Sequence, residues 1–401
     1  MKRSLSYLFL PAILFTVILM QDGFEAYDKK QISEYTKAKY TSKAQNFFGY
    51  WEWLNRIRAN PSTGKIDHLA YNNTRKQARS HKLSSKRSLT MDWTDLGPGN
   101  QGGRTRAFLI DRTDYDKLYA GGVAGGLWTS DDAGYNWKQV AGFDDYSTVA
   151  SICQTINGDI YVGTGEGMYS NFGMATGGLP GNGIYKSTDG GVTFSHLSST
   201  SATLNSASDT WSHVNRLAAD PNDPLKLYAA TEKGVRVSAD GGTSWSLINM
   251  DVSSTSPAMD IDISNDGNTI IASVTANCYL SSDGGDNFTK INGDGGFPSS
   301  SIGRIELSIA PSDNNYIYAG IVNGGGALAG IYQSKDAGLN WTLIGPGGSQ
   351  SFKPYSNSKQ SQGTYDNALG VALDDPEKIF VGGVGLYSWT PTDGWNKIAT
   401  L

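Results

Sequence analysis

Short runs rich in aliphatic, β-branched and aromatic residues recur along most of the chain. Five of them share one pattern and occupy residues 117–121, 159–163, 226–230, 316–320 and 378–382. Turn sequences such as Asp220-Pro221 and Asp375-Pro376 come just before several of these runs, and another apolar run leads into each turn. Short apolar runs bounded by turn residues are typical of β-strands. The pattern therefore predicts many short strands joined by tight turns.

A second motif, Ser-x-Asp-x-Gly-x-x-aromatic, closes each group of runs. Its five complete copies contain Asp132, Asp189, Asp240, Asp283 and Asp336, and a degraded sixth copy keeps Asp393. In such a turn the Asp accepts hydrogen bonds from backbone N–H groups of its own hairpin, and the Gly adopts a positive φ. The final Trp or Phe is expected to pack between neighbouring sheets. We interpret these aspartates as structural and not catalytic, because each turn has too few acidic oxygens for calcium.

The spacing of this motif predicts the fold. Successive aspartates are 57, 51, 43, 53 and 57 residues apart, and each interval has room for four strands but not for a helix. Four strands per unit of roughly fifty residues is typical of a β-propeller blade. The sequence therefore predicts an all-β propeller over residues 93–401 with six visible blades.

Residues 93–99 match residues 341–347 and read as an outermost strand without a blade of its own. We interpret this as part of a seven-bladed or larger array that is incomplete at the C-terminus. The alternative is a six-bladed ring with a spare strand.

The N-terminal part has a different character. Lys2 and Arg3 precede an apolar run over residues 5–20, which predicts a cleaved signal peptide over residues 1–26 and a secreted or cell-surface protein without a membrane span. Residues 27–92 form a basic leader and linker, in which residues 32–57 have a helical apolar pattern. This helix is expected to pack on the propeller; the alternative is a pro-segment or a partner-binding helix.

Composition and charge narrow the function. The chain has 49 Gly, 21 Tyr and 10 Trp, and only 18% charged residues, as expected for many strands and turns. The leader carries 14 Lys/Arg against 5 Asp/Glu, whereas residues 93–401 carry 17 against 31. The basic stretch at residues 75–79 has no nucleic-acid-binding motif around it, so no nucleic-acid partner is predicted. Cys153 and Cys278 are expected to be buried free thiols.

The aspartate turns resemble those of the Asp-box, or bacterial neuraminidase repeat, propellers. That group includes sialidases, the sortilin ectodomain, two-propeller xyloglucanases and photosystem assembly factors. Residues 161–166 and 183–191, and residues 93–98 leading to Arg104, more closely resemble large exported repeat proteins of Bacteroidetes. Many of those proteins use type IX secretion. The resemblance covers residues 93–401 and implies the fold without implying one activity.

The resemblance also indicates where a ligand would bind. The aspartate turns lie on one face of such propellers, and long loops lie on the other. Here residues 163–183, 196–216 and 345–370 are the long loops. Their aromatic, amide and acidic side chains suit a glycan or an extracellular protein. The candidate ligand-binding residues are Arg104, Glu166, Tyr169, Asn171, Trp211, Arg216, Arg304, Tyr365 and Asp366.

The sequence gives less support to an enzyme than to a binding protein. Arg104, Arg216 and Arg304 stand at inner strands as a sialidase triad would, but their offsets differ and a structural role is favoured. Xyloglucanases carry a catalytic Asp where this chain has Val123. The remaining candidate catalytic pair for a glycoside hydrolase is Glu166 and Asp209.

The sequence contains no nucleotide loop, Ser/His/Asp constellation or clustered metal-ligand motif, so no cofactor or metal is expected. The sequence therefore favours an exported recognition or scaffold propeller that binds a glycan or protein. The alternatives are a glycoside hydrolase of sialidase-like or xyloglucanase-like type and a structural spacer of a larger surface protein.

Overall fold

The computed structural model describes Gln77, which is helical, and residues 104–400 except 124, 141–147, 168–179, 203–208, 350 and 357–360. The chain divides into residues 1–67 and 68–401, and all described residues belong to the second unit. The predicted signal peptide, the leader other than Gln77, and the strand at residues 93–99 lie outside the described residues. None of the described residues forms a helix long and apolar enough to cross a membrane.

Six antiparallel sheets of four strands follow one another along the chain. The first three sheets consist of β1 (Thr105–Ile110), β2 (Leu118–Gly122), β3 (Gly126–Ser130) and β4 (Lys138–Gln139); β5 (Val149–Gln154), β6 (Ile160–Thr164), β7 (Ile184–Ser187) and β8 (Ser195–His196); and β9 (Val214–Ala219), β10 (Leu227–Thr231), β11 (Gly234–Ser238) and β12 (Ser246–Leu247). The last three consist of β13 (Ala258–Ile263), β14 (Ile270–Val274), β15 (Asn277–Ser281) and β16 (Thr289–Lys290); β17 (Arg304–Ile309), β18 (Ile317–Val322), β19 (Leu328–Ser334) and β20 (Thr342–Pro346); and β21 (Ala368–Val371), β22 (Ile379–Gly382), β23 (Gly385–Thr390) and β24 (Gly394–Thr400). A short 3-10 helix, η2 (Ser198–Thr200), interrupts the β-structure.

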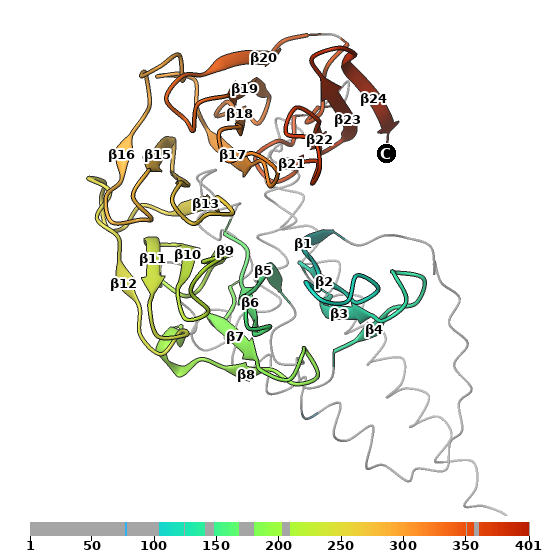
Figure 1. Cartoon of the computed structure of the whole chain (residues 1–401), viewed down its shortest axis with the longest axis vertical. Coiled ribbons are helices and arrows are strands. Elements are labelled where there is room, and N and C mark those ends of the chain that lie inside the picture. Colours follow the sequence, from blue (N-terminus) through green and yellow to red (C-terminus); the bar gives the residue numbers. More distant parts are fainter. Residues whose placement is uncertain are drawn as a thin grey trace, which may run out of the picture. The chain divides into compact units, whose positions relative to one another are not determined.

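The strands of every sheet pair in sequence order. The first strands of successive sheets contact one another from β1 to β21, so β1, β5, β9, β13, β17 and β21 lie on the inner side of the array and line a central channel (Figure 1). This arrangement is a β-propeller and confirms the predicted fold with six four-stranded blades. The repeating aspartate turn located all six sheets because each copy ends the third strand of one sheet.

The strand register separates the two faces of the propeller. In the first sheet Ile110 pairs with Leu118, so the β1–β2 turn and the aspartate turn after Ser130 lie at the same end of the strands. Gly122 pairs with Thr105 and with Gly126 at the other end. Residues 163–183, 196–216 and 345–370 connect strands at this second end, which we call the loop face.

The aspartate turns have the hydrogen bonds that their sequence predicts. In the third sheet the Ser238 hydroxyl donates to Asp240 at 2.8 Å, and the backbone N–H of Ser244 donates to the same carboxylate at 2.9 Å. Gly242 has a φ of 89°. Matching bonds occur at Asp132, Asp189, Asp283 and Asp336. These turns close the third and fourth strands of each blade on the face opposite the loop face.

The hydrophobic core lies between neighbouring sheets. One cluster joins Tyr119 and Leu127 of the first sheet to Val149 and Ile160 of the second, and similar clusters join the later pairs of sheets. Cys153 and Cys278 are buried free thiols, as predicted. This sheet-on-sheet packing fixes the inner strands that carry the candidate site.

Candidate functional site

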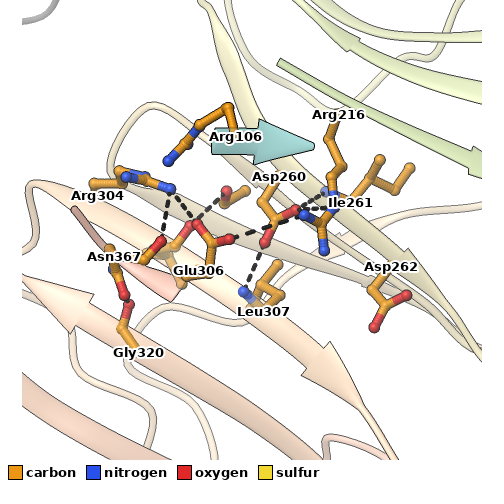
Figure 2. Close-up of polar contacts among 12 residues, drawn as sticks. Arg106, Arg216, Asp260, Ile261, Asp262, Arg304, Glu306, Leu307, Gly320 and Asn367 are labelled. Atoms are coloured by element: carbon orange, nitrogen blue, oxygen red, sulfur yellow. Dashed lines mark hydrogen bonds and ion pairs between the residues drawn. The ribbon is translucent and has the colours of Figure 1, made fainter. Parts of the chain in front are cut away.

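Four arginines lie near the loop-face ends of three inner strands. Arg104 precedes β1, Arg106 is its second residue, Arg216 lies in β9 and Arg304 begins β17. Figure 2 shows three of them facing a group of carboxylates from neighbouring strands. The propeller therefore gathers residues that are far apart in sequence at one mouth of the channel.

Arg104 joins the first sheet to the second and to the loop before β21. Its guanidinium lies 3.3 Å from the Glu166 carboxylate, and its Cζ lies 5.7 Å from the centre of the Tyr365 ring. Glu166 is only 1% exposed, and its other carboxylate oxygen has no hydrogen-bond partner. The structure thus brings three of the predicted ligand-binding residues together, and it pairs the candidate catalytic carboxylate with an arginine.

Arg216 bridges the third, fourth and fifth sheets. Its Nε lies 3.2 Å from Asp260 of β13, and its Nη1 lies 4.0 Å from Glu306 of β17. The Asp260 carboxylate raises the pKa of the Arg216 guanidinium, which stays charged. The Arg216 side chain remains 40% exposed, so part of its guanidinium faces the channel.

Asp260 is held by the backbone as well as by Arg216. It accepts hydrogen bonds from the N–H groups of Leu307 at 2.7 Å and Ile261 at 2.9 Å. Burial raises the pKa of Asp260 to about 7, even though Arg216 acts in the opposite direction. Because both oxygens are occupied and the residue is 1% exposed, Asp260 ties the fourth sheet to the fifth.

Arg304 is enclosed by its partners. It contacts the Glu306 carboxylate and donates hydrogen bonds to the carbonyl oxygens of Thr364 at 3.0 Å and Asn367 at 3.3 Å. Only 3% of Arg304 is exposed. This arginine therefore anchors the loop before β21 and has little surface left for a ligand.

Arg106 differs from the other three. It donates one hydrogen bond, from Nη1 to the Tyr365 carbonyl oxygen at 3.0 Å, and no carboxylate of the described chain forms an ion pair with it. Burial lowers the pKa of Arg106 to about 10, and the charge of Arg304 adds to this effect. The Arg106 guanidinium is thus a cation in a confined space without a carboxylate in contact.

Arg106 and Arg216 line a cavity of about 260 Å³ within the channel. The strands β1, β5, β9 and β13 contribute its walls. Phe108, Ile152 and Ile263 contribute apolar side chains to the lining, and Asp262 contributes its one carboxylate. The Phe108 side chain is 55% exposed although it belongs to an inner strand. The cavity therefore combines two cationic groups and polar backbone surface with a few exposed apolar side chains.

The other predicted residues lie in different surroundings. Trp211 is buried and packs edge-on against Trp245 with ring centres 5.4 Å apart, so it belongs to the core and is not presented for stacking on a ligand. Asp209 accepts a hydrogen bond from the Trp211 N–H at 3.0 Å, so its carboxylate holds its own turn. Tyr169 and Asn171 lie outside the described residues.

Asp366 lies beside the arginines of the channel mouth. Burial raises the pKa of its carboxyl, although Arg104 and Arg106 act in the opposite direction. Arg106, Asp260 and Glu306 were not identified by sequence reasoning. The sequence signal was alternation, since Asp260-x-Asp262 and Arg304-x-Glu306 each place two charges on one side of a strand. Arg106 lies at the register shift between Thr105 and Ala107, where alternation does not apply. No group of three or more potential metal ligands occurs among the described residues.

Comparisons with known proteins support the fold. The sequence matches no family model and no curated protein. Similar solved structures include an ancestral GH74 enzyme, with a TM-score of 0.55 and 17% identity over 73% of this chain and 40% of that one. They also include a GH74 enzyme of Niastella koreensis, with a TM-score of 0.54 and 16% identity over 73% of this chain and 46% of that one.

A third similar structure is the GH74 xyloglucanase of Xanthomonas campestris, with a TM-score of 0.53 and 13% identity over 73% of this chain and 46% of that one. The chain thus spans less than half the length of each of these proteins. At such identities the likeness shows the propeller fold alone.

Proposed function

We propose that the chain is an exported recognition propeller that binds a glycan or an extracellular protein at the centre of its loop face. The observation that carries this proposal is the state of the acidic groups there. Glu166 and Asp260 are each 1% exposed and each paired with an arginine. The Arg104 and Arg216 side chains remain 31% and 40% exposed, and their N–H groups suit binding through directional hydrogen bonds.

Glycoside hydrolysis is the second candidate, supported by the similarity in fold to GH74 enzymes. Hydrolysis requires two carboxyl groups that reach opposite sides of the glycosidic bond, at separations of roughly 5 to 9.5 Å. Glu166 is enclosed and paired, and Asp209 holds its own turn. Hydrolysis would require both carboxyl groups to leave these contacts, whereas binding would not. The binding function therefore fits the observed contacts better. A spacer role in a larger surface protein is the third candidate.

Two assays on the same purified chain separate these functions. A glycan array, together with a pull-down of secreted proteins, measures binding, and a panel of chromogenic glycosides measures turnover. We expect binding without turnover. We also expect Arg104→Ala and Tyr365→Ala to reduce binding, because both side chains belong to the channel mouth. Arg112→Gln, in the exposed turn after β1, is the matched control.

Turnover that is lost in Glu166→Gln or Asp209→Asn would establish the hydrolase and refute a binding-only protein. If neither binding nor turnover is detected, the spacer role gains support. Export itself is tested by expressing the full chain in a bacterial host and following cleavage near residue 26 by mass spectrometry.

A further inference from the structure

Arg106 is the channel arginine whose charge is not matched by a contacting carboxylate in the described chain. Three carboxylates pair with the other three arginines: Glu166 with Arg104, Asp260 with Arg216, and Glu306 with Arg304. Glu306 also lies 4.0 Å from Arg216, so its charge is shared by two cations before Arg106 is considered. An unmatched cation in a confined site is costly unless an anion can approach it.

The two remaining acidic groups do not fill this role. Asp262 accepts backbone hydrogen bonds from Ile309 at 2.8 Å and from Ile263 at 2.9 Å, so its oxygens are directed at the strands. Burial raises the pKa of Asp262, and it likewise raises that of Asp366. Neither group makes an ion pair with Arg106 in the described chain. Glu306 and Glu166 act favourably on the charge of Arg106 without contacting it, so an anion in contact with Arg106 would come from outside this set of residues.

The volume and lining of the cavity beside Arg106 limit the kind of molecule that can carry this anion. Its volume of about 260 Å³ is below the ~300 Å³ at which pockets for drug-sized ligands begin, so it suits a small acid or one residue of a longer molecule. Phe108, Ile152 and Ile263 present apolar side chains to it, and the Ser151 hydroxyl in the wall already donates to the Val214 carbonyl oxygen. The half-exposed Phe108 side chain favours an apolar group beside the anion over a sugar ring.

We propose that the central channel binds the carboxylate of a small apolar acid, with Arg106 and the exposed edge of Arg216 as its cationic partners. The apolar part of the acid contacts Phe108, Ile152 and Ile263. A carboxylate fits the planar donor fork of arginine. The acid is either a free molecule or the C-terminal residue of a peptide, and the chemistry at the cavity is the same. This inference rests on the proposed recognition function and adds a ligand deeper in the channel, because the cavity extends from Arg106 toward Ala219 and Ile263 at the other ends of their strands.

Ligand-observed NMR with defined probes tests the inference on the full chain. The probes are N-acetyl-L-leucine, its neutral amide, 4-methylpentanoate and D-glucuronate. We expect N-acetyl-L-leucine to bind and the amide to bind at least about tenfold more weakly, as the loss of a charge-assisted hydrogen bond predicts. If 4-methylpentanoate binds as well as N-acetyl-L-leucine, the free acid is the simpler ligand; if it binds more weakly, the peptide terminus is favoured.

Variants assign the binding to the cavity. Arg106→Gln should lower the affinity for N-acetyl-L-leucine by roughly tenfold or more, and Arg106→Lys should have an intermediate effect because it keeps the charge but loses the fork. Asp262→Asn should raise the affinity for the acid and leave that for the amide unchanged, because it removes a like charge from the cavity wall. Arg112→Gln should leave both affinities unchanged. Thermal unfolding checks that each variant is folded. If Arg106→Gln does not fold, the affinities of Arg106→Lys and Asp262→Asn test the inference.

Several results would overturn the inference. They are equal binding of the acid and its amide, glucuronate binding as tight as that of N-acetyl-L-leucine, an Arg106→Gln variant that is folded and binds normally, and no binding of any probe. Glycan-array or protein binding that persists in these cases and depends on Arg104 and Tyr365 would leave the recognition function standing. Its absence as well would remove both.

Discussion

The Tyr119 hydroxyl of β2 donates a hydrogen bond of 2.7 Å to the carbonyl oxygen of Gly190, in the aspartate turn of the next sheet. The same relationship recurs twice, from Tyr161 to Gly241 at 3.1 Å and from Tyr228 to Gly284 at 3.0 Å. Each of these tyrosines is almost fully buried. One sequence position in the second strand thus links each of these three sheets to the turn of its successor.

This link makes the hydroxyl group of Tyr161 a stabilising element. Tyr161→Phe removes the donor and leaves the Gly241 carbonyl oxygen unpaired, so we expect the free energy of unfolding to fall by about 1 kcal/mol. Urea unfolding followed by tryptophan fluorescence measures the change. Phe380 occupies the equivalent strand position in the sixth sheet and is only half-buried. Phe380→Tyr should change stability little. A Tyr161→Phe variant as stable as the parent chain would show that the bond contributes nothing.

The fold was predictable because each blade contains the same short sequence motif. The aspartate turn needs only a hydrogen bond within one hairpin, such as Ser238 to Asp240, and its residues are neighbours in sequence. Its spacing therefore located all six blades, with the correct strand count. Buried tyrosines of the second strand were visible as part of a repeated run, but their bonds to the next sheet were not.

The candidate site was predictable only in part, because it depends on contacts between sheets. The sequence placed Arg104 and Glu166 on the loop face, but their pairing joins residues 62 positions apart. The sequence cannot distinguish a loop tryptophan that contacts a ligand from one that packs in the core. Trp211 was predicted to bind a ligand, but it packs on Trp245. Arg106 follows Arg104 by two residues, and its place at the cavity became clear only with the register of β1.

The aspartate turns should make the protein sensitive to acid. Hydrogen bonds from the Ser244 side chain and backbone, and from Ser238, lower the pKa of Asp240 to about 2, whereas an unfolded Asp has a pKa of about 3.9. A lowered folded pKa gives stability that is present above about pH 4 and lost as the pH falls through about 2. The urea midpoint of Asp240→Asn should therefore approach that of the parent chain between about pH 5 and pH 2.

The matched control is Asp294→Asn, an exposed aspartate in the loop after β16. Its difference from the parent chain should change less over the same pH range. If the difference in urea midpoint between Asp240→Asn and the parent chain does not change with pH, the role assigned to the turn carboxylate is wrong.

Asp260 should have the opposite pH dependence. Burial raises its pKa to about 7, above the unfolded value of about 3.9, although Arg216 acts against the shift. A raised folded pKa gives stability that is complete below about pH 4 and is lost as the pH rises through about 7. Asp260→Asn removes this titration, so its free energy of unfolding should improve relative to the parent chain between about pH 4 and pH 7.

Equilibrium unfolding of both proteins at a series of pH values measures this change. The absolute stability of Asp260→Asn is not the test, because the substitution also unpairs Arg216. Arg216→Gln removes the partner and keeps the carboxyl, so it should shift the titration of Asp260 further upward. A pH-independent difference between Asp260→Asn and the parent chain would mean that Asp260 does not titrate in this range.

Gly163 in β6 should resist any side chain, because the inner strands of its own sheet and the next lie directly against it. A Cβ at this position would lie 2.3 Å from the Ser151 hydroxyl oxygen and 2.6 Å from Cγ1 of Val214. Gly163→Ala must push β6 away from β9, and we expect a loss of about 1–3 kcal/mol in the free energy of unfolding. Gly370 in β21 is the matched control, because it is also a strand glycine without positive φ, and a Cβ added there would meet no atom of another residue within 4 Å. Gly370→Ala should be neutral or slightly stabilising, since alanine reduces the entropy of the unfolded chain. Thermal and urea unfolding of the two variants compare them directly, and equal stabilities would show that the sheets can separate at Gly163 without cost.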